Sequence, residues 1–136
     1  VHLRPTSPFR PPELIDEGIA LLQADSDADS VRSISESIQN PYKTWTVQGD
    51  VIRPIIETGQ YESYNMPRQL LPKTYWHNGV LDIVTVNCLR TKGSMSGNRI
   101  LPIFVDTEYA IDLDTEQEWK AAESVMTQTT LPYIKP

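Results

Sequence analysis

The spacing of apolar residues along this chain of 136 residues alternates between the helical and the extended pattern. An apolar stripe at helical spacing begins after Pro12, a residue suited to a first helical position, and predicts one amphipathic helix. A second helix is predicted after Asp114. The first stripe contains Leu14, Ile15, Gly18, Ile19 and Leu22, and the second contains Trp119, Ala122, Val125 and Met126.

Between the two stripes, short runs rich in branched and aromatic residues predict strands. The predicted strands cover residues 30–34, 44–47, 51–56, 80–84 and 101–105. The second and third of these flank a turn that contains Gly49, which predicts a hairpin. Asn78-Gly79 predicts a tight turn before the fourth strand, and a short helix is expected at 85–91 before a polar loop at 92–97.

The chain opens on residues 1–3, which resemble the end of a strand, and a proline-rich loop at 4–12 follows. A strand end, a polar loop and a helix form the unit in which open α/β sheets bind ligands, at the carboxyl ends of their strands. The loop contains Arg4 and Arg10, and it is therefore a candidate binding loop. Its alternative role is that of a connector whose prolines only fix its shape.

Composition and charge narrow the class of protein. The length suits one compact domain, and 39% hydrophobic and 22% charged residues are typical of a globular protein. A net charge of −6 argues against nucleic acid or an anionic membrane as the main partner. The single Cys88 cannot form an internal disulfide, and no long apolar run or signal-peptide pattern is present. We therefore expect a soluble, cytoplasmic protein.

Asp112 and Asp114 are the candidate metal-binding residues. Separated by one residue and flanked by Ile111 and Leu113, they would point to the same side of an extended backbone. Two hard oxygen ligands suit Mg²⁺, which is commonly held by one or two carboxylates while the phosphates of a substrate complete its shell. The alternative is a helix cap, because Asp114 is followed three residues later by Gln117, as in a capping box.

Two further features call for an explanation. Asp82 lies inside the apolar strand predicted at 80–84, where a buried carboxylate must be paired or neutralised. It serves either as a structural hydrogen-bond anchor or as part of a site.

Residues 57–73 lack periodicity but contain aromatic side chains, which points to burial against a partner subunit.

Five segments, spread over nearly the whole chain, carry a resemblance to a known family. They are Leu3-Arg4-Pro5-Thr6-Ser7-Pro8-Phe9-Arg10, Asn40-Pro41-Tyr42-Lys43, Pro67-Arg68-Gln69-Leu70-Leu71-Pro72, Asn78-Gly79 and Ile111-Asp112-Leu113-Asp114-Thr115. In this order they resemble the motifs of CMP-sialic acid synthetases, the acylneuraminate cytidylyltransferases. This family joins CTP to a nine-carbon sugar acid, releases pyrophosphate, depends on Mg²⁺ and serves cell-surface polysaccharide biosynthesis.

The resemblance implies a fold and an assembly. Residues 1–43 and 76–136 would form part of a doubly wound, Rossmann-like nucleotidyltransferase sheet with helices on its faces. Residues 44–75 would form an extended arm by which one subunit of a homodimer reaches the site of its partner.

The resemblance also implies roles for individual residues. Asp112 and Asp114 match the catalytic, metal-binding carboxylates. Arg68 would hold the carboxylate of the sugar acid, unless it is a surface arginine that caps a short helix. Lys43 could equally be a solvated surface charge, and Asn78 only a turn residue. The candidate substrate-binding residues are Arg4, Lys43, Arg68, Asn78 and Asp82.

Departures from the family pattern leave the substrates open. Asp82 and Met95-Ser96 stand where many members have aromatic residues, so neither the sugar acid nor the nucleotide is fixed. Members of the family begin with a strand and a basic loop that cradles the triphosphate, and nothing before Val1 supplies them. We therefore expect part of a cytidylyltransferase that is inactive alone. The alternatives are a truncated, non-catalytic dimerising module and a nucleotidyltransferase that uses another nucleoside triphosphate.

Overall fold

The computed structural model describes residues 1–59 and 61–128. The chain divides into two compact units. Residues 1–35, with the chain from residue 77 onward, form the sheet unit, and residues 36–76 form the arm unit. The arm expected at residues 44–75 lies inside the arm unit.

Both predicted helices are present in the sheet unit. α1 spans Glu13–Ala24 and α2 spans Glu116–Gln128. Together with the strands they give a mixed α/β fold with a small sheet. Within the two described ranges, no helix combines the length and the apolar content needed to cross a membrane.

Three strands form the main sheet, in the order β4-β1-β5. They are β1 (Ser30–Glu36), β4 (Tyr75–Val84) and β5 (Ile100–Phe104). β1 and β5 are parallel, with Ser30 opposite Ile100 and Ile34 opposite Phe104. Each overlaps a predicted strand, although β4 begins at Tyr75 and the prediction began at Val80.

β4 runs antiparallel to β1. The N–H of Thr85, after the end of β4, donates to the carbonyl of Asp29, before the start of β1, over 2.9 Å. Towards the other end, the side chain of Asn78 donates to the hydroxyl of Ser35 over 2.8 Å. Residue numbers therefore increase along β4 in the direction in which they decrease along β1, so the two strands are antiparallel. Because β1 and β5 are parallel, the sheet is mixed.

The first residues of the chain extend this sheet beyond β4. His2 and Asp82 form an antiparallel bridge, with backbone hydrogen bonds of 2.7 and 3.2 Å. Residues 1–3 therefore run antiparallel to β4, in the same direction as β1 and β5. The loop that follows residue 3 and the segment that follows β5 consequently leave the sheet at the same edge.

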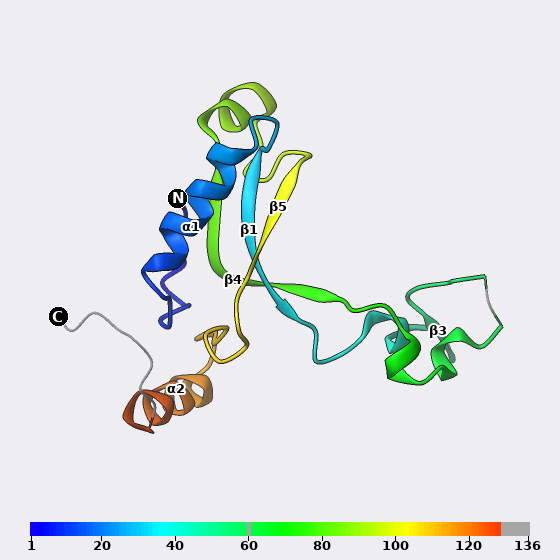
Figure 1. Cartoon of the computed structure of the whole chain (residues 1–136). Helices are drawn as coiled ribbons and strands as arrows, with labels where there is room; N and C mark the ends of the chain where they lie inside the picture. The colour runs from blue at the N-terminus through cyan, green and yellow to red at the C-terminus, as the bar shows by residue number, and fades with distance from the viewer. Residues whose placement is uncertain (60, 129–136) are drawn as a thin grey trace. The chain divides into compact units, whose positions relative to one another are not determined.

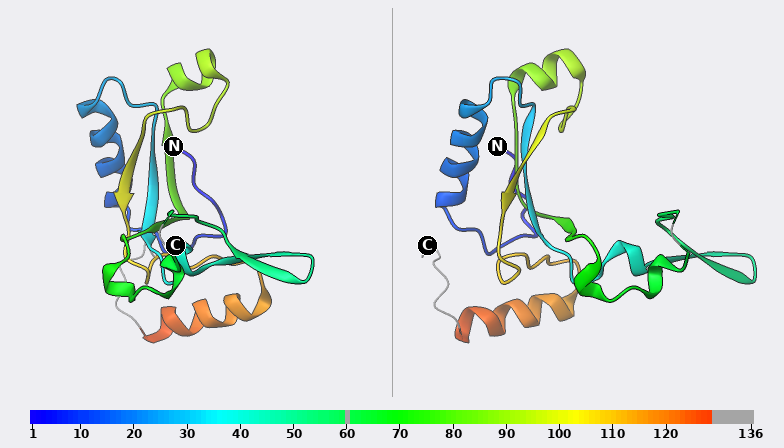
Figure 2. Two further views of the ribbon diagram at one scale, coloured as in Figure 1. Left: turned by 90° about the vertical axis from the view of Figure 1, so that its right-hand side faces the viewer. Right: turned by 45° about the vertical axis from the view of Figure 1, so that its right-hand side comes forward.

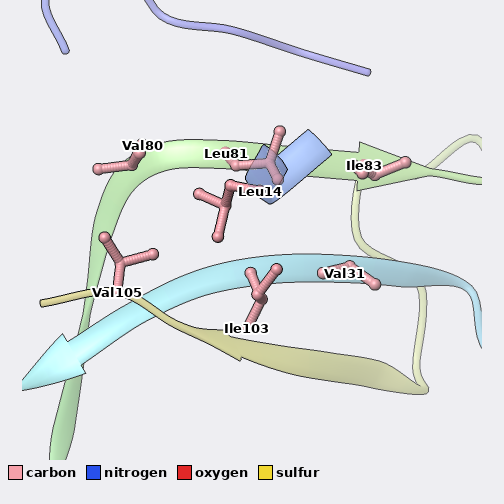
Figure 3. Packing of buried hydrophobic residues seen from close by; sticks show 7 residues of the cluster. All are labelled: Leu14, Val31, Val80, Leu81, Ile83, Ile103 and Val105. Carbon is pink, nitrogen blue, oxygen red and sulfur yellow. The ribbon is translucent and has the colours of Figure 1, made fainter. Parts of the chain in front are cut away.

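α1 runs along one face of the sheet, as the views in Figure 1 and Figure 2 show. Figure 3 shows Leu14 of α1 surrounded by apolar side chains of the strands and of the residue after β5. They are Val31, Val80, Leu81, Ile83, Ile103 and Val105. Full burial of such a side chain is worth about 1.5–3 kcal/mol. Gly18 lets α1 approach closely, because a Cβ there would lie 2.7 Å from Cδ1 of Ile83.

The arm unit contains the predicted hairpin. β2 (Trp45–Gln48) pairs with β3 (Val51–Pro54), and Trp45 lies opposite Pro54. The ring of Trp45 packs against that of Tyr64, with centroids 4.6 Å apart. Three single-turn helices complete the unit: η1 (Pro41–Lys43), η2 (Ser63–Asn65) and η3 (Arg68–Leu70).

One prediction of local structure is wrong. Asn78-Gly79 is not a turn between elements, because both residues lie within β4. Gly79 has a positive φ of 74°, as a glycine in a tight turn often does. Here this conformation produces an irregularity inside a strand instead of a turn. Asp112 and Asp114 lie in a segment, residues 110–114, without regular secondary structure, so their sharing one side of an extended backbone stays a prediction.

The short helix expected at 85–91 is present. It contains η4 (Cys88–Lys92), which has the wider π-type turn. The polar loop that follows leads to β5, and it contains Gly93 and Gly97, both with positive φ.

Candidate functional site

Two motif segments from opposite ends of the sequence meet at one edge of the sheet. The N–H of Leu113 donates to the carbonyl of Thr6 over 2.9 Å. This bond joins the proline-rich loop to the segment that contains Asp112 and Asp114. The carboxyl ends of parallel strands are where open α/β sheets bind ligands. The candidate site of the sheet unit therefore lies at this edge.

The two predicted metal-binding carboxylates differ in environment. Asp112 is partly buried, and its Oδ1 accepts a hydrogen bond of 3.2 Å from the N–H of Leu113. Asp114 is exposed. Within residues 1–59 and 61–128, no group of three or more His, Cys, Asp or Glu side chains is placed to hold a metal ion. Two carboxylates still suit Mg²⁺ when the phosphates of a substrate and water supply its other ligands.

Asp114 is not the cap of α2, and this corrects the alternative proposed from the sequence. The hydroxyl of Thr115 accepts a hydrogen bond of 3.2 Å from the N–H of Glu118. In return, the carboxylate of Glu118 accepts from the N–H of Thr115 over 2.8 Å. This reciprocal pair is a capping box that begins one residue later than expected. The side chain of Asp114 is therefore not needed to start α2.

Asp82 lies at the centre of a cluster of basic side chains, which we call the Asp82 cluster: His2, Arg4, Arg32, His77 and Asp82. Asp82 Oδ1 accepts from Arg32 Nε and contacts His77 Nε2, both at 3.0 Å. Asp82 Oδ2 lies 3.6 Å from Arg4 Nη2 and 3.9 Å from His2 Nδ1. Asp82 is only 8% exposed, so its charge is neutralised by these neighbours. Both roles proposed for Asp82 from the sequence remain open, because an anchor for arginines also shapes a site.

The irregularity at Gly79 brings His77 and Asp82 together. In a regular strand, residues five positions apart point to opposite faces and lie roughly 17 Å apart. The positive φ of Gly79 interrupts this regular geometry, and β4 bends sharply beside Val80 (Figure 3). His77 and Asp82 then share one side of β4, while Leu81 packs on α1 from the other side.

Arg4 packs directly on Gly79. A Cβ at Gly79 would lie 3.1 Å from Cδ and Nη1 of Arg4. The backbone of Arg4 is fixed as well, because its carbonyl accepts from the N–H of Ser7 and from Nη2 of Arg10. The guanidinium of Arg4 is thereby held beside Asp82.

Asn78, a predicted substrate-binding residue, is 3% exposed and bonded to the protein. Its Oδ1 accepts from the hydroxyl of Ser33 and from the N–H of Val80, and its Nδ2 donates to the hydroxyl of Ser35. These bonds tie β4 to β1 just before Gly79. Asn78 therefore has a structural role, and its contact with a substrate stays a prediction.

The remaining predicted residues, Lys43 and Arg68, lie in the arm unit. Lys43 Nζ donates to the carbonyl of Tyr64 over 3.0 Å, which links η1 to η2. Arg68 donates to the carbonyl of Ile38 and to Oε1 of Gln39, over 3.3 and 3.4 Å. Lys43 and Arg68 therefore make structural contacts within the arm unit. Each side chain keeps N–H donors that these contacts do not use.

Arg68 lines a small cavity of about 140 Å³ in the arm unit. Asn40, Lys73 and Thr74 also line this cavity. The hydroxyl of Thr74 is buried and has no hydrogen-bond partner among the described residues. The cavity is therefore polar. Arg68 contributes positive charge, whereas Lys73 is paired at 3.2 Å with Glu36, which also lines the cavity.

A second buried carboxylate, Asp29, organises the loop before β5. It accepts hydrogen bonds from Lys92 Nζ, at 2.7 Å, and from the N–H groups of Asn98 and Arg99. The hydrogen bond with Lys92, followed by those with the two N–H groups, lowers the pKa of Asp29 to about 2. Gly97 is required beside it, since a Cβ there would overlap the side chain of Asp29.

The sequence did not identify Arg32, His77 and Ser96 as members of a site. Arg32 links Asp82 to Ser96, because its Nη2 donates to Ser96 Oγ over 2.7 Å while its Nε donates to Asp82. Arg32 lies inside a predicted strand whose alternation was unclear. An Arg in one predicted strand and an Asp in another become a clue only once the two strands are known to pair.

Neither a scan against protein-family models nor a search of curated proteins gives a match to this chain.

Proposed function

We propose that this chain supplies the sugar-acid side and the metal carboxylates of a Mg²⁺-dependent cytidylyltransferase of the CMP-sialic acid synthetase type. Its product would be a CMP-linked nonulosonic acid, made in the cytoplasm. In this proposal the small sheet is part of a doubly wound, Rossmann-like sheet.

One observation carries the proposal. The hydrogen bond from Leu113 to Thr6 holds the loop that resembles the family's substrate loop against the segment that resembles its metal-binding segment. These segments lie at opposite ends of the sequence, and the sequence motifs alone assign each of them to the site. Their contact at the carboxyl edge of parallel strands supports a shared site.

The proposed roles follow from the chemistry of each side chain. Asp112 and Asp114 would hold Mg²⁺, which offsets negative charge on phosphates and on the leaving pyrophosphate. The planar guanidinium of Arg68 suits a bidentate contact with the carboxylate of the sugar acid. Arg4, held in place by Gly79 and Asp82, would orient the substrates beside the acidic segment.

A second candidate function is a non-catalytic dimerising module, and the surface of the hairpin favours it. Val47 is 73% exposed and Ile52 is 58% exposed, while Val51 and Ile55 are also exposed. Exposed apolar side chains gathered on one element are typical of an interaction surface. The same surface would serve the homodimer of the enzyme, so binding of substrates has to separate the two functions.

The test is a calorimetric titration of the 136-residue chain with CTP, with and without Mg²⁺, followed by a panel of nonulosonic acids. We expect Mg²⁺ to strengthen CTP binding. Changing Asp112→Asn and Asp114→Asn together should reduce this effect by roughly tenfold or more, because a charge-assisted ligand is lost. Asp106→Asn is the matched control, since Asp106 is an exposed carboxylate in the same connection.

Pyrophosphate release with the four nucleoside triphosphates is measured in parallel. Release with CTP and one acid would support a complete active site. Release with another triphosphate would favour a nucleotidyltransferase of different base specificity. If the chain neither binds CTP in a Mg²⁺-dependent way nor binds any nonulosonic acid, the enzymatic proposal is wrong and the dimerising module is favoured.

A further inference from the structure

The Asp82 cluster contains more positive than negative charge. Two guanidinium groups, Arg4 and Arg32, lie within 3.6 Å of the single carboxylate of Asp82. With both imidazoles neutral, one positive charge remains unbalanced. The side chains of Arg4 and Arg32 are 40% and 31% exposed, so this charge is screened by water less than a fully exposed one.

The unbalanced charge belongs to Arg4. Arg10, Arg32 and Arg99, in the same unit, each donate hydrogen bonds through their guanidinium groups. The guanidinium of Arg4 donates none to any residue that the structure describes, and its closest carboxylate oxygen is 3.6 Å away. A guanidinium has five N–H donors in a fixed fork, which matches a carboxylate or a phosphate.

Arg4 is also held in advance of any binding. The side chain of Arg4 packs against Gly79. The N–H of Ser7 and Nη2 of Arg10 donate hydrogen bonds to the carbonyl of Arg4. A group that is already in place loses little conformational freedom when it binds a ligand. Such preorganisation is expected of a binding residue and is not needed by a solvated surface charge.

His77 is the titratable neighbour in this cluster. Its Nε2 contacts Asp82, and its Nδ1 has no partner among the described residues. Burial lowers the pKa of His77, while the nearby carboxylate of Asp82 opposes this shift and Arg32 and Arg4 add to it. A bound anion would favour the protonated imidazole, as Asp82 does now.

We propose that Arg4, with Arg32 and His77 around Asp82, forms a binding site for an oxyanion, either a carboxylate or a phosphate group. Asp82 is a positioning residue that holds Arg32 and His77 in place. Arg4 belongs to the proline-rich loop, whose Thr6 contacts the acidic segment at Leu113, whereas Arg32 bonds Ser96 of the loop before β5. The proposal rests on the proposed function only for the identity of the oxyanion. It would be a phosphate of the nucleotide, or the acid group of the sugar in place of the contact proposed for Arg68.

The test is an NMR titration of the 136-residue chain at constant ionic strength, with sulfate, pyrophosphate and acetate as separate probes. The signals followed are the Nε–H of Arg4 and Arg32 and the amide of Gly79. We expect saturable shifts, and Arg4→Gln should weaken binding by roughly tenfold or more. Arg4→Lys, which keeps the charge but loses the fork, should give an intermediate affinity.

Arg90→Gln is the matched control. It removes the same charge from an exposed residue of the same unit, in η4, away from the cluster. Stronger binding of sulfate and pyrophosphate would identify a phosphate site, and stronger binding of acetate a carboxylate site. Binding that is unchanged in Arg4→Gln, or that falls equally in Arg90→Gln, would overturn the proposal, as would the absence of saturation with all three probes.

A pH series gives an independent readout. Sulfate keeps its charge between about pH 5 and 8, the range in which histidine titrates. Sulfate affinity should rise as the pH falls below 6.5, the ordinary pKa of histidine, because protonated His77 adds a positive charge. His77→Gln should remove most of this rise, and an unchanged rise would exclude His77 from the site. All of these titrations measure binding alone, so their outcome does not depend on any transferase activity.

Discussion

Gly79 meets two separate requirements, one from its own backbone and one from its neighbour. Its φ is 74°, and a Cβ at this position would press against Arg4. We predict that Gly79→Ala lowers the free energy of unfolding by more than the roughly 1–2 kcal/mol that left-handed backbone costs a residue with a side chain. It should also displace Arg4 and weaken oxyanion binding. Chemical denaturation and the sulfate titration measure the two effects.

Gly49→Ala separates the two requirements. Gly49 has φ 62°, but nothing lies within 4 Å of the position that its Cβ would take. This variant should therefore show the backbone cost alone and leave oxyanion binding unchanged. Equal losses of stability in the two variants, with Arg4 undisturbed, would show that the contact between Gly79 and Arg4 has no energetic weight.

Asp29 gives a prediction about pH. Folding lowers its pKa from 3.8 to about 2, chiefly through the hydrogen bond with Lys92. The stabilisation is therefore complete above pH 3.8 and is lost as the pH falls to about 2, where the folded carboxylate takes up its proton. Asp29→Asn should be less stable than the parent at neutral pH, and the difference should shrink over this acid range.

Urea unfolding at several pH values measures this difference. Asp27→Asn, at an exposed position of the same turn, is the control and should leave stability nearly unchanged. A difference between Asp29→Asn and the parent that stays constant down to the lowest pH would mean that the charge of Asp29 is not what stabilises the loop.

At single residues, the sequence predicted the chemistry better than the partners. A carboxylate at Asp82 had to be neutralised, and it is. Its partner His77 could not be found, because regular alternation places residues 77 and 82 on opposite faces. The positive φ of Gly79 interrupts that alternation inside β4. The Asn-Gly pair predicted a tight turn between elements and not an irregularity within a strand.

At the scale of the element, α2 separates the two interpretations of the acidic segment. Thr115 and Glu118 form its capping box, whereas the side chain of Asp114 is exposed and outside it. Thr115→Ala should lower the stability of α2 by about 1 kcal/mol. Asp114→Ala should leave the helix intact while it reduces Mg²⁺ binding. Hydrogen exchange of the α2 amides, together with a Mg²⁺ titration, tests both. Faster exchange in Asp114→Ala alone would restore the helix cap as the role of this residue.

The elements themselves were largely predictable, because each is specified by its own side chains. α1 has an apolar stripe, and the β2-β3 hairpin has alternation around a glycine turn. The exact ends of the elements were less predictable. β3 ends at Pro54 although a strand was predicted over 51–56, and the N–H of Ile55 donates to the carbonyl of Thr44. The sheet order β4-β1-β5 did not follow from the sequence, since pairing joins strands that are distant along the chain.

At the scale of the whole molecule, the chain combines a sheet unit that has its own apolar core with an arm unit whose hairpin leaves apolar side chains in solvent. In the arm unit, Val47, Val51 and Ile52 are exposed although their strands are paired, and Ile55, just after β3, is exposed as well. A two-stranded hairpin is marginally stable alone and gains stability when another surface covers it. A second copy of the chain would provide such a surface, as the proposed homodimer requires.

Replacing Ile52 by lysine tests this arrangement. Ile52→Lys places a charge at the centre of the hairpin and should raise the dissociation constant of the dimer roughly tenfold or more, because an ammonium group cannot be buried there without a partner. Sedimentation velocity over a range of concentrations measures the change. Ile38→Lys is the matched control, since Ile38 is an exposed isoleucine of the arm unit outside the hairpin, 73% exposed against 58% for Ile52. If only Ile52→Lys shifts the chain towards monomer, the hairpin is the contact surface. If both variants or neither variant shifts the chain towards monomer, the dimer forms through a surface other than the hairpin. A different partner would then have to cover the apolar side chains of the hairpin.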